Sequence, residues 1–514
     1  MRPAAVLCAI LATLAALSLA WSVKPPPKGG LTVVFGDEPR TLDPALATQI
    51  GEGRILMALL EGLTVPDAAT LEPRPGAAES WEVSADGRTV TFLLRDGGAW
   101  SDGRPVTAED FRWSWLRVLR TPEAANWELL KPIRGAGDFR AKKTSEEAVG
   151  LRASGPRTLV VELERPTPWF LQLTTLMTYL PVPRPAVEAH GRLWTRPGNF
   201  AGNGPFVLSE WSPNHRLVAL RNGRFRTPPA ITAITFLSVP PGPAQFNLYE
   251  GGMARWVADP PPALVRDLLG RPDLHVAPRL GVSFVRMNVK RAPFDDNRVR
   301  RAFSLAIDRE RIVKTNGAGQ VPWAAFVPPG LAGYEGPRPA LGDPTAARAR
   351  LAQAGGKLPR IRFLYPASSE FSVIAQTLQA TWKEALGVEI VLDRVDKKEW
   401  LRRRRELDYE LCLSSWIGDY RDPNTFLEIF LSDSGNNQTG WGDAVYDALV
   451  KRASLESGAH RMATLAEAEE RLLATGPAAT LYVPVTIELW DPKLRGISEN
   501  LMGVHPLDGV EWGR

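Results

Sequence analysis

An acidic residue between aromatic residues follows a short apolar run, in the segment Trp416-Ile-Gly-Asp419-Tyr420. A carboxylate beside aromatic rings that exclude water can bind a cation strongly, and Asp419 is the residue that would do so. Its alternative role is to cap a following helix. Asp422 is better placed for capping because it directly precedes Pro423, and proline favours the first position of a helix. Asp419 is therefore a candidate ligand-binding residue.

Other acidic residues offer an enzymatic alternative. Asp102 and Asp110 could form a catalytic carboxylate pair, but Asp102-Gly103 is typical of a turn, and Asp110 follows Thr107 at the spacing of a helix cap. A secreted hydrolase, for example a glycosidase using Asp102, Asp419 or Glu428, remains the second hypothesis. The run Arg402 to Arg405 points around a whole helix, which favours a solvated surface over a focused phosphate site.

Composition excludes several classes of function. Neighbouring histidines are at least 25 residues apart, and the two cysteines, Cys8 and Cys412, form no Cys-x-x-Cys pair, so no metal site is expected. The chain has no phosphate-binding loop, no nucleophile elbow and no dinucleotide fingerprint, so no cofactor is expected. A net charge of +5 is too diffuse to indicate nucleic-acid binding. A hydrophobic content of 44% is typical of a folded globular protein.

The stretch from 343 to 414 predicts a parallel sheet. Strands and helices alternate there in the order β-α-β-α-β after an initial helix, and such units form parallel sheets with right-handed crossovers. Ligands bind beyond the carboxyl ends of parallel strands, which is where the segment 416–420 is expected. The predicted elements are a helix from Asp343 to Gly355, strands at 360–365, 388–395 and 409–414, and helices at 371–386 and 397–405.

Three further elements have clear signals. Strands at 78–84 and 89–95 flank Asp86-Gly87 and predict a hairpin. Thr107 with Asp110 predicts the start of a helix over 111–119. Residues 296–314 predict one continuous amphipathic helix.

The N-terminus predicts export. Arg2 precedes an uncharged run whose apolar centre is followed by Ser18-Leu19-Ala20, a small-x-small pattern that predicts signal cleavage after Ala20. An uncleaved membrane anchor is the alternative, because about 20 apolar residues can span a bilayer. The proline-rich segment after Ala20 predicts a short stiff spacer.

Several motifs together resemble those of family 5 extracellular solute-binding proteins, the peptide receptors of ABC importers. The resemblance begins with Ala78 to Arg95, Trp100-Ser-Asp-Gly103 and Val106 to Phe111. It continues in chain order through Gly202-Asn-Gly-Pro-Phe206, Phe294 to Arg300 with Ala306-Ile-Asp-Arg309, Trp416 to Leu427, and Ser432 to Asn437. It spans most of residues 31–510 and is closest to the oligopeptide-binding branch.

This resemblance implies an α/β, two-lobed fold of the periplasmic-binding-protein type II kind, with an extra domain inserted in the first lobe. The expected segments are a signal peptide at 1–20, a linker at 21–30, the first lobe at 31–60, 191–285 and 481–514, the inserted domain at 61–190, and the second lobe at 286–480.

The resemblance also implies a function. The chain would be a periplasmic receptor, not an enzyme, that binds a short peptide and delivers it to an ABC transporter permease, and it would act as a monomer. Asp419 matches the position that takes the α-ammonium of the peptide. The expected ligand-binding residues are Asp419, Trp416, Gly418, Tyr420 and Trp441.

Two points stay open at this level. No basic residue directly precedes Trp416, and Phe371 stands where a basic side chain would serve a peptide carboxylate, so the motif does not identify a partner for the peptide C-terminus. Some relatives bind nickel chelates, haem or sugars, and the same fold can serve as an anchored sensor or a peptide-binding chaperone.

Overall fold

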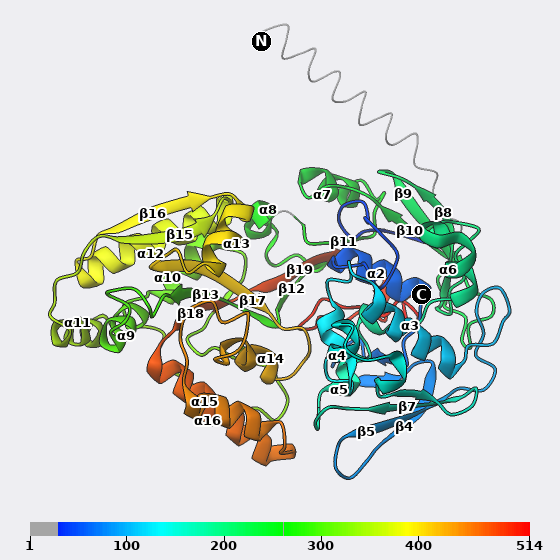
Figure 1. Ribbon diagram of the computed structural model, residues 1–514. Helices are drawn as coiled ribbons and strands as arrows, with labels where there is room; N and C mark the ends of the chain where they lie inside the picture. Colours follow the sequence, from blue (N-terminus) through cyan, green and yellow to red (C-terminus); the bar gives the residue numbers. More distant parts are fainter. Residues whose placement is uncertain (1–28, 261, 514) are drawn as a thin grey trace, which may run out of the picture.

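The computed structural model describes residues 29–260 and 262–513, which form two α/β lobes lying side by side (Figure 1). The predicted signal segment at 1–20 and nearly all of the predicted linker at 21–30 lie outside the described residues. Among the described residues, no helix combines the length and the apolar character needed to cross a membrane.

A seven-stranded sheet forms the centre of the first lobe. Its middle strand, β1 (Leu31–Val34), is buried along its whole length and pairs in parallel with a strand on either side. A short apolar run of this kind is typical of a central strand covered on both faces. The spatial order is β12 (Leu274–Pro278), β19 (Val485–Trp490), β11 (Trp256–Ala258), β1, β10 (Ala233–Leu237), β9 (Arg216–Arg221) and β8 (Phe206–Ser212). The helices of this lobe include α2 (Ile50–Leu59), α6 (Arg184–His190), α7 (Pro243–Glu250) and α8 (Pro262–Leu268).

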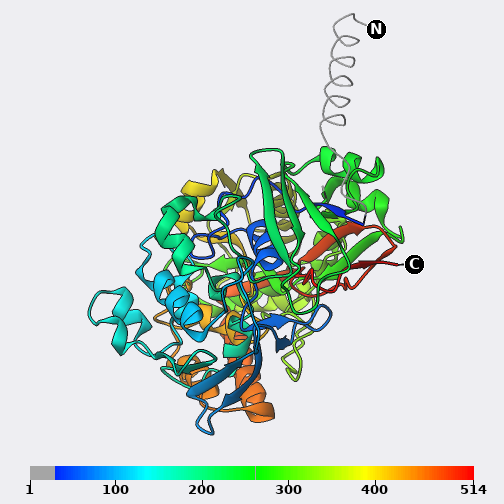
Figure 2. The same ribbon diagram turned by 90° about the vertical axis from the view of Figure 1, so that its right-hand side faces the viewer.

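A smaller antiparallel sheet lies at the other end of the first lobe from β8 and β9 (Figure 2). It contains the predicted hairpin, and its order is β4 (Ala78–Val83), β5 (Thr89–Leu94), β7 (Thr158–Glu162) and β6 (Leu151–Ala153). Beside it, α3 (Ala108–Arg120) begins at the predicted capping box, in which Thr107 and Asp110 satisfy each other's backbone groups. These elements, with β2 (Thr64–Pro66) and β3 (Pro73–Pro75), fall within the expected inserted segment, here called the insert region (residues 61–190).

The second lobe contains the predicted β-α-β-α-β unit. Strands β16 (Ile390–Val395) and β17 (Leu411–Ile417) both pair in parallel with β15 (Ile361–Pro366). The sheet order is β14 (Val321–Pro322), β18 (Ala478–Val483), β13 (Gly281–Met287), β17 (Leu411–Ile417), β15 (Ile361–Pro366) and β16 (Ile390–Val395). Helices α11 (Pro344–Gln353), α12 (Ser369–Leu386) and α13 (Lys397–Arg405) complete the unit, and α14 (Asn424–Leu427), α15 (Ala444–Ala453) and α16 (Gly458–Thr475) follow it.

Both faces of this second sheet are covered. All seven residues of β13 are buried, and its side chains divide between two apolar cores. Val285 and Met287 pack with α12, whereas Val282 and Phe284 pack with α14, α15 and α16. This division follows from the alternation of side chains along a strand.

Two predicted boundaries were wrong. Strand β17 ends at Ile417 instead of Ser414, so Trp416 lies within the strand. The single helix expected over 296–314 is two helices, α9 (Asn297–Leu305) and α10 (Arg309–Asn316). The break occurs because the Asp308 side chain accepts a hydrogen bond from the backbone N–H of Arg311 and starts a new helix there.

The chain crosses between the lobes twice. It leaves the first sheet after Pro278 and enters the second at Gly281, and it returns between Val483 and Val485. The backbone N–H of Arg279 donates to the carbonyl of Pro484 over 2.8 Å, which ties the two crossings together. We propose that these crossings form the hinge, a few residues outside the expected second-lobe limits of 286 and 480.

Candidate functional site

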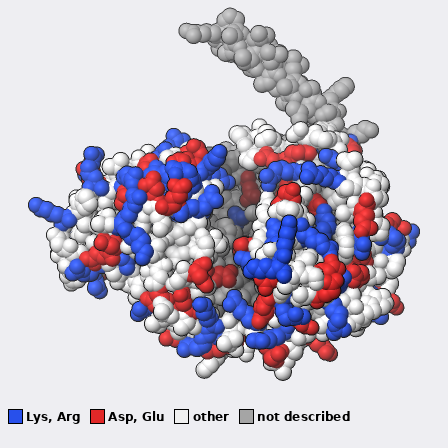
Figure 3. Space-filling view, viewed as in Figure 1, with Lys and Arg blue, Asp and Glu red and all other residues white. Residues whose placement is uncertain are grey.

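A cavity of about 400 Å³ lies between the two lobes. Figure 3 shows the groove between the lobes on one face of the molecule. Residues of α2 and the insert region form one wall, and the segment after β17 forms another, with the residues at the first crossing and near the C-terminus. A cavity of this size at a domain interface is typical of a small-molecule site. Apolar lining residues include Ile50, Met57, Leu176, Leu280, Ile417 and Met502.

Five charged residues line this cavity: Arg54, Glu128, Arg279, Asp419 and Arg421. Three of them have an ion-pair partner within the protein. These pairs are Arg54 with Glu488 at 3.1 Å, Glu128 with Lys131 at 2.8 Å, and Arg421 with Glu72 at 2.6 Å.

The remaining two, Arg279 and Asp419, have opposite charges, and neither side chain makes a hydrogen bond or ion pair within residues 29–260 and 262–513. An unpaired charge in a cavity is costly unless a ligand compensates it. The negative charge of Asp259 acts on Arg279, whereas no cation acts on Asp419, so the cavity is suited to a ligand that carries a cation.

Asp419 is held rigidly by its neighbours. The backbone N–H of Gly418 donates to the carbonyl of Leu280 over 2.8 Å, which continues the pairing of β17 with β13. The N–H of Asp419 itself donates to Oγ1 of Thr425 over 3.2 Å. Gly418 is closely packed: a Cβ there would lie 3.0 Å from side-chain atoms of Leu280 and Thr425, which would have to shift to accept it. The backbone thus fixes where the Asp419 carboxylate enters the cavity.

The Asp419 carboxylate is exposed to the cleft, yet the surrounding walls displace bulk water from it. This burial within the cleft raises its pKa from 3.8 to about 6, and no neighbouring cation opposes the shift. The group is still mostly ionised at pH 7. It can therefore bind a cationic ligand group that brings the missing charge.

Tyr420 connects the two lobes through its ring. The ring stacks on Trp169 of the insert region, with 5.5 Å between centroids and 4° between planes. Its hydroxyl donates to Oε1 of Glu428 over 3.0 Å and accepts from Nδ2 of Asn424 over 2.9 Å. Asn424 also donates to the second oxygen of Glu428 over 2.9 Å.

Two ion pairs are formed by the residues that follow Tyr420 in the chain, Arg421 and Asp422. Arg461 forms a buried two-pronged ion pair with Asp422, both distances being 2.7 Å, and its guanidinium lies 5.1 Å from the centre of the Trp169 ring. Arg421 pairs with Glu72 across the lobes. Sequence reasoning missed Trp169, Arg461 and Arg279, because each lies far from residues 416–420 in the chain and no local motif marks it.

The structure places the expected ligand-binding residues in two groups. Gly418, Asp419 and Tyr420 line the cavity. Trp416 and Trp441 do not line it: Nε1 of Trp416 donates to the carbonyl of Thr425 over 2.8 Å, and Trp441 is 7% exposed in the core of the second lobe. Trp416 therefore supports the loop from behind.

The carboxylates of the hydrolase hypothesis do not meet in this cavity. Asp102 pairs with Arg104 in its turn, and Asp110 bonds the Thr107 backbone in its cap. Neither lines the inter-lobe cavity. Glu428 does not line the cavity either, and both of its oxygens are engaged by Tyr420 and Asn424. Its pKa is raised to about 7, first by burial and further by the negative charge of Asp419.

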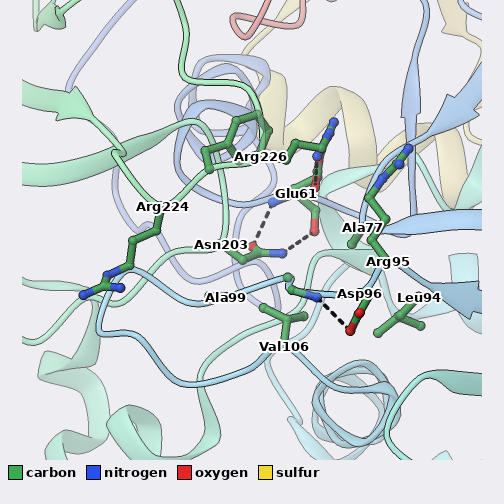
Figure 4. Close-up of a pocket in the computed structure, with 13 residues that line it drawn as sticks. Glu61, Ala77, Leu94, Arg95, Asp96, Ala99, Val106, Asn203, Arg224 and Arg226 are labelled. Atoms are coloured by element: carbon green, nitrogen blue, oxygen red, sulfur yellow. Dashed lines mark hydrogen bonds and ion pairs between the residues drawn. The ribbon is translucent and has the colours of Figure 1, made fainter.

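A second, smaller pocket of about 60 Å³ lies within the first lobe (Figure 4). Arg226 lies 2.6 Å from one oxygen of Glu61, whose pKa burial raises to about 7 although Arg226 opposes the shift. Asn203 accepts from the backbone N–H of Glu61 and donates to its carbonyl, each over 2.9 Å. Gly202 and Gly204 lie so close to the Leu59 backbone that a Cβ would clash. The motif 202–206 therefore holds α2 in place.

Comparison with known proteins gives consistent matches. Residues 72–438 match the model of bacterial extracellular solute-binding proteins, family 5 Middle. The chain is 32% identical to the probable deoxycholate-binding periplasmic protein YgiS of Escherichia coli, covering 89% of each chain. It is 30% identical to the oligopeptide-binding protein OppA of Bacillus subtilis, covering 91% of this chain and 90% of OppA.

A solved structure extends these matches to three dimensions. The unliganded open form of the murein tripeptide-binding protein MppA superposes with a TM-score of 0.83 and 31% identity, over 94% of this chain and 97% of MppA. This likeness confirms the two-lobed fold expected from the sequence.

Proposed function

Because the chain belongs to the bacterial extracellular solute-binding proteins of family 5, we propose that it binds short peptides and delivers them to the permease of an ABC importer. The observation that carries the proposal is the unpaired Asp419 carboxylate in the inter-lobe cavity. Every peptide with a free N-terminus carries an ammonium, so this contact serves peptides of any sequence. Curated relatives named for peptide binding, such as OppA of Bacillus subtilis, support the same ligand class.

We also propose that the protein works without catalysis, as a monomer outside the cytoplasm. Of the carboxylates in the hydrolase hypothesis, Asp102, Asp110 and Glu428 are engaged in a turn, a helix cap and the Tyr420 network, and Asp419 is the one that lines the cavity. The names of periplasmic relatives support the location, and a signal peptide ending at Ala20 would provide the route. A receptor of this kind needs no bound cofactor.

The direct test is binding without turnover. The purified protein is titrated calorimetrically with a tripeptide, with its N-acetylated form and with deoxycholate. We expect one peptide per protein, much weaker binding of the acetylated peptide, and an intact peptide after incubation. Tight binding of deoxycholate together with no response to any peptide would overturn the proposal, and so would peptide cleavage.

A further inference from the structure

Large apolar side chains line the inter-lobe cavity on both sides. They are Ile50 and Met57 of α2, Leu176 and Met177 of the insert region, Leu280 and Ile417 on the side of the second lobe, and Leu501 and Met502 near the C-terminus. Ile50 is 47% exposed and Ile417 is 39% exposed, although the two residues belong to opposite lobes of one cavity. Large apolar side chains left open in a cavity indicate an apolar binding partner.

Two glycines make room for these side chains in the cavity wall. Gly281 pairs with Ile417 across β13 and β17, and a Cβ on Gly281 would lie 2.6 Å from Cδ1 of Ile417. In α2, a Cβ on Gly53 would lie 3.2 Å from Sδ of Met177. Each glycine therefore lets a large apolar side chain pack directly against the backbone. The positions of Ile417 and Met177 in the wall are set by this packing.

Methionine is concentrated at this cavity. Of the seven methionines in the chain, Met57, Met177 and Met502 line it. Met57 belongs to the face of α2 that also carries Ile50 and Gly53, at the three- and four-residue spacing of one helix face. An unbranched thioether adapts its shape to different apolar partners and is frequent at surfaces that bind varied ligands. The wall is thus suited to large apolar side chains of more than one shape.

Charged side chains of a ligand would find little compensation in this cavity. Its arginines and its glutamate are paired within the protein or are acted on by an opposite charge. Of the described charged residues that line it, Asp419 is the one whose charge no other residue compensates, and the α-ammonium of the peptide would take that place. An acidic or a second basic side chain would lose its water without gaining a partner, so the cavity favours an apolar one.

We propose that Ile417 and the methionines of the facing wall, Met57 and Met177, select peptides whose first residue has a large apolar side chain. This inference rests on the proposed function and adds the ligand class. The side chain of a first residue branches from the carbon atom that carries the ammonium, so it begins close to the Asp419 carboxylate. Ile417 lies two residues before Asp419, which puts their Cα atoms at most about 7 Å apart. The first residue of the peptide is therefore the one whose side chain meets Ile417.

The test is titration calorimetry with tripeptides that differ only in the first residue: diglycine extended at its N-terminus by alanine, leucine, phenylalanine or glutamate. We expect the leucine and phenylalanine peptides to bind the wild type at least about tenfold more tightly than the alanine peptide, because more apolar surface leaves water. The glutamate peptide should bind most weakly. The double variant Ile417→Thr, Met57→Gln keeps a β-branched residue in the strand and an unbranched one in the helix. It should lower the preference for leucine over alanine to about threefold or less and change the affinity for the alanine peptide little, whereas damage to the Asp419 contact would weaken all four peptides alike.

Val445→Thr is the matched control, because Val445 is exposed on α15 of the second lobe and does not line the cavity. Wild-type affinities for the alanine, leucine and phenylalanine peptides that agree within about threefold would overturn the inference, even if the double variant does not fold. A preference for leucine that is undiminished in the folded double variant would overturn the role of Ile417 and Met57. The proposed function survives both results, because the peptides still bind. It fails, and this inference with it, if the wild type binds no peptide of the series.

Discussion

Replacing Asp419 by asparagine removes the charge of the cavity carboxylate and keeps its shape. In the unliganded protein this carboxylate has no side-chain partner within residues 29–260 and 262–513, so the substitution breaks no described contact. In the peptide complex it would leave the α-ammonium without its counter-charge. The Asp419→Asn variant therefore separates the ligand contact from the stability of the fold.

The size of the effect follows from the electrostatics of the site. An ion pair at about 4 Å contributes roughly 4 kcal/mol at an effective dielectric constant near 20. Truncating one member of a buried charge pair costs about 2 to 5 kcal/mol of binding. Because Asp419 is exposed to the cleft, solvent screens part of this interaction, and we expect the lower part of that range, about 2 to 3 kcal/mol. This corresponds to a dissociation constant about 30- to 150-fold higher.

The dependence on pH gives a second, independent measure. The pKa of Asp419 is raised to about 6, so lowering the pH below 6 protonates the carboxylate and competes with the ammonium. Wild-type affinity should fall by up to roughly tenfold per pH unit below that value and level off near the affinity of Asp419→Asn, which should itself show no such dependence.

The same pKa shift predicts the sign of the effect on stability. A folded pKa above the ordinary 3.8 means that the folded protein holds the proton more tightly than the unfolded chain does. The stabilisation from Asp419 is thus fully present below about pH 3.8 and is lost as the pH rises through about 6. At pH 7 the asparagine variant should melt at the wild-type temperature or slightly above it.

Titration calorimetry at pH 7.5 and pH 5, with a free and an N-acetylated tripeptide, measures these effects. Asp433→Asn is the matched control, because Asp433 is exposed in the second lobe and does not line the cavity. If Asp419→Asn binds the free peptide within about threefold of the wild type, Asp419 does not hold the α-ammonium. Wild-type binding that is unchanged by acetylation would contradict this contact as well.

Three further predictions follow from the same contacts. Saturating peptide should lower the radius of gyration in small-angle scattering, because a ligand between hinged lobes favours closure; an unchanged value would contradict the hinge at the two crossings. Arg461→Met should lower the free energy of unfolding by about 3 to 5 kcal/mol in urea denaturation, because it leaves Asp422 as a buried unpaired charge; a loss below 1 kcal/mol would show that water replaces the ion pair. Trp169→Ala should weaken peptide binding, because Tyr420 loses the ring on which it stacks. Calorimetry on the folded variant measures this effect, and an unaltered affinity would contradict a role of the stack in binding.

Local signals predicted the elements that carry the site. The β-α-β-α-β order was confirmed for each strand. It could be predicted because helix caps such as Gly387 and the apolar runs of strands depend on residues that are neighbours in the sequence. Asp419 was placed past a parallel strand on the same basis, and the structure brings it to the cavity wall. The end of β17 was predicted three residues early, since Ser414 and Ser415 interrupt the apolar run of a strand that pairs with β13 as far as Ile417. Pairing with a partner strand thus extended the element beyond its local signal.

Long-range contacts could not be predicted. Arg279 follows a strand end with no motif around it, and only the fold shows that it lines the same cavity as Asp419. Trp169 and Arg461 meet at one ring although 292 positions separate them in the chain. The roles of Trp416 and Trp441 were also beyond the sequence, because an indole can face a ligand or fill a core equally well. Trp441 is 7% exposed and packs in the core of the second lobe.

The contacts beside Asp419 link ligand binding to the position of the lobes. Tyr420, next in the chain, stacks on Trp169, and Arg421, the residue after it, pairs with Glu72, so both neighbours contact the insert region. Asp419 itself extends from the second lobe on a backbone fixed by Leu280 and Thr425. A peptide held by this carboxylate therefore occupies the space across which these contacts form. Any movement that separates the lobes must break the stack and the ion pair. A ligand that contacts both Asp419 and the opposite wall favours the arrangement in which the lobes are together, as these two contacts do.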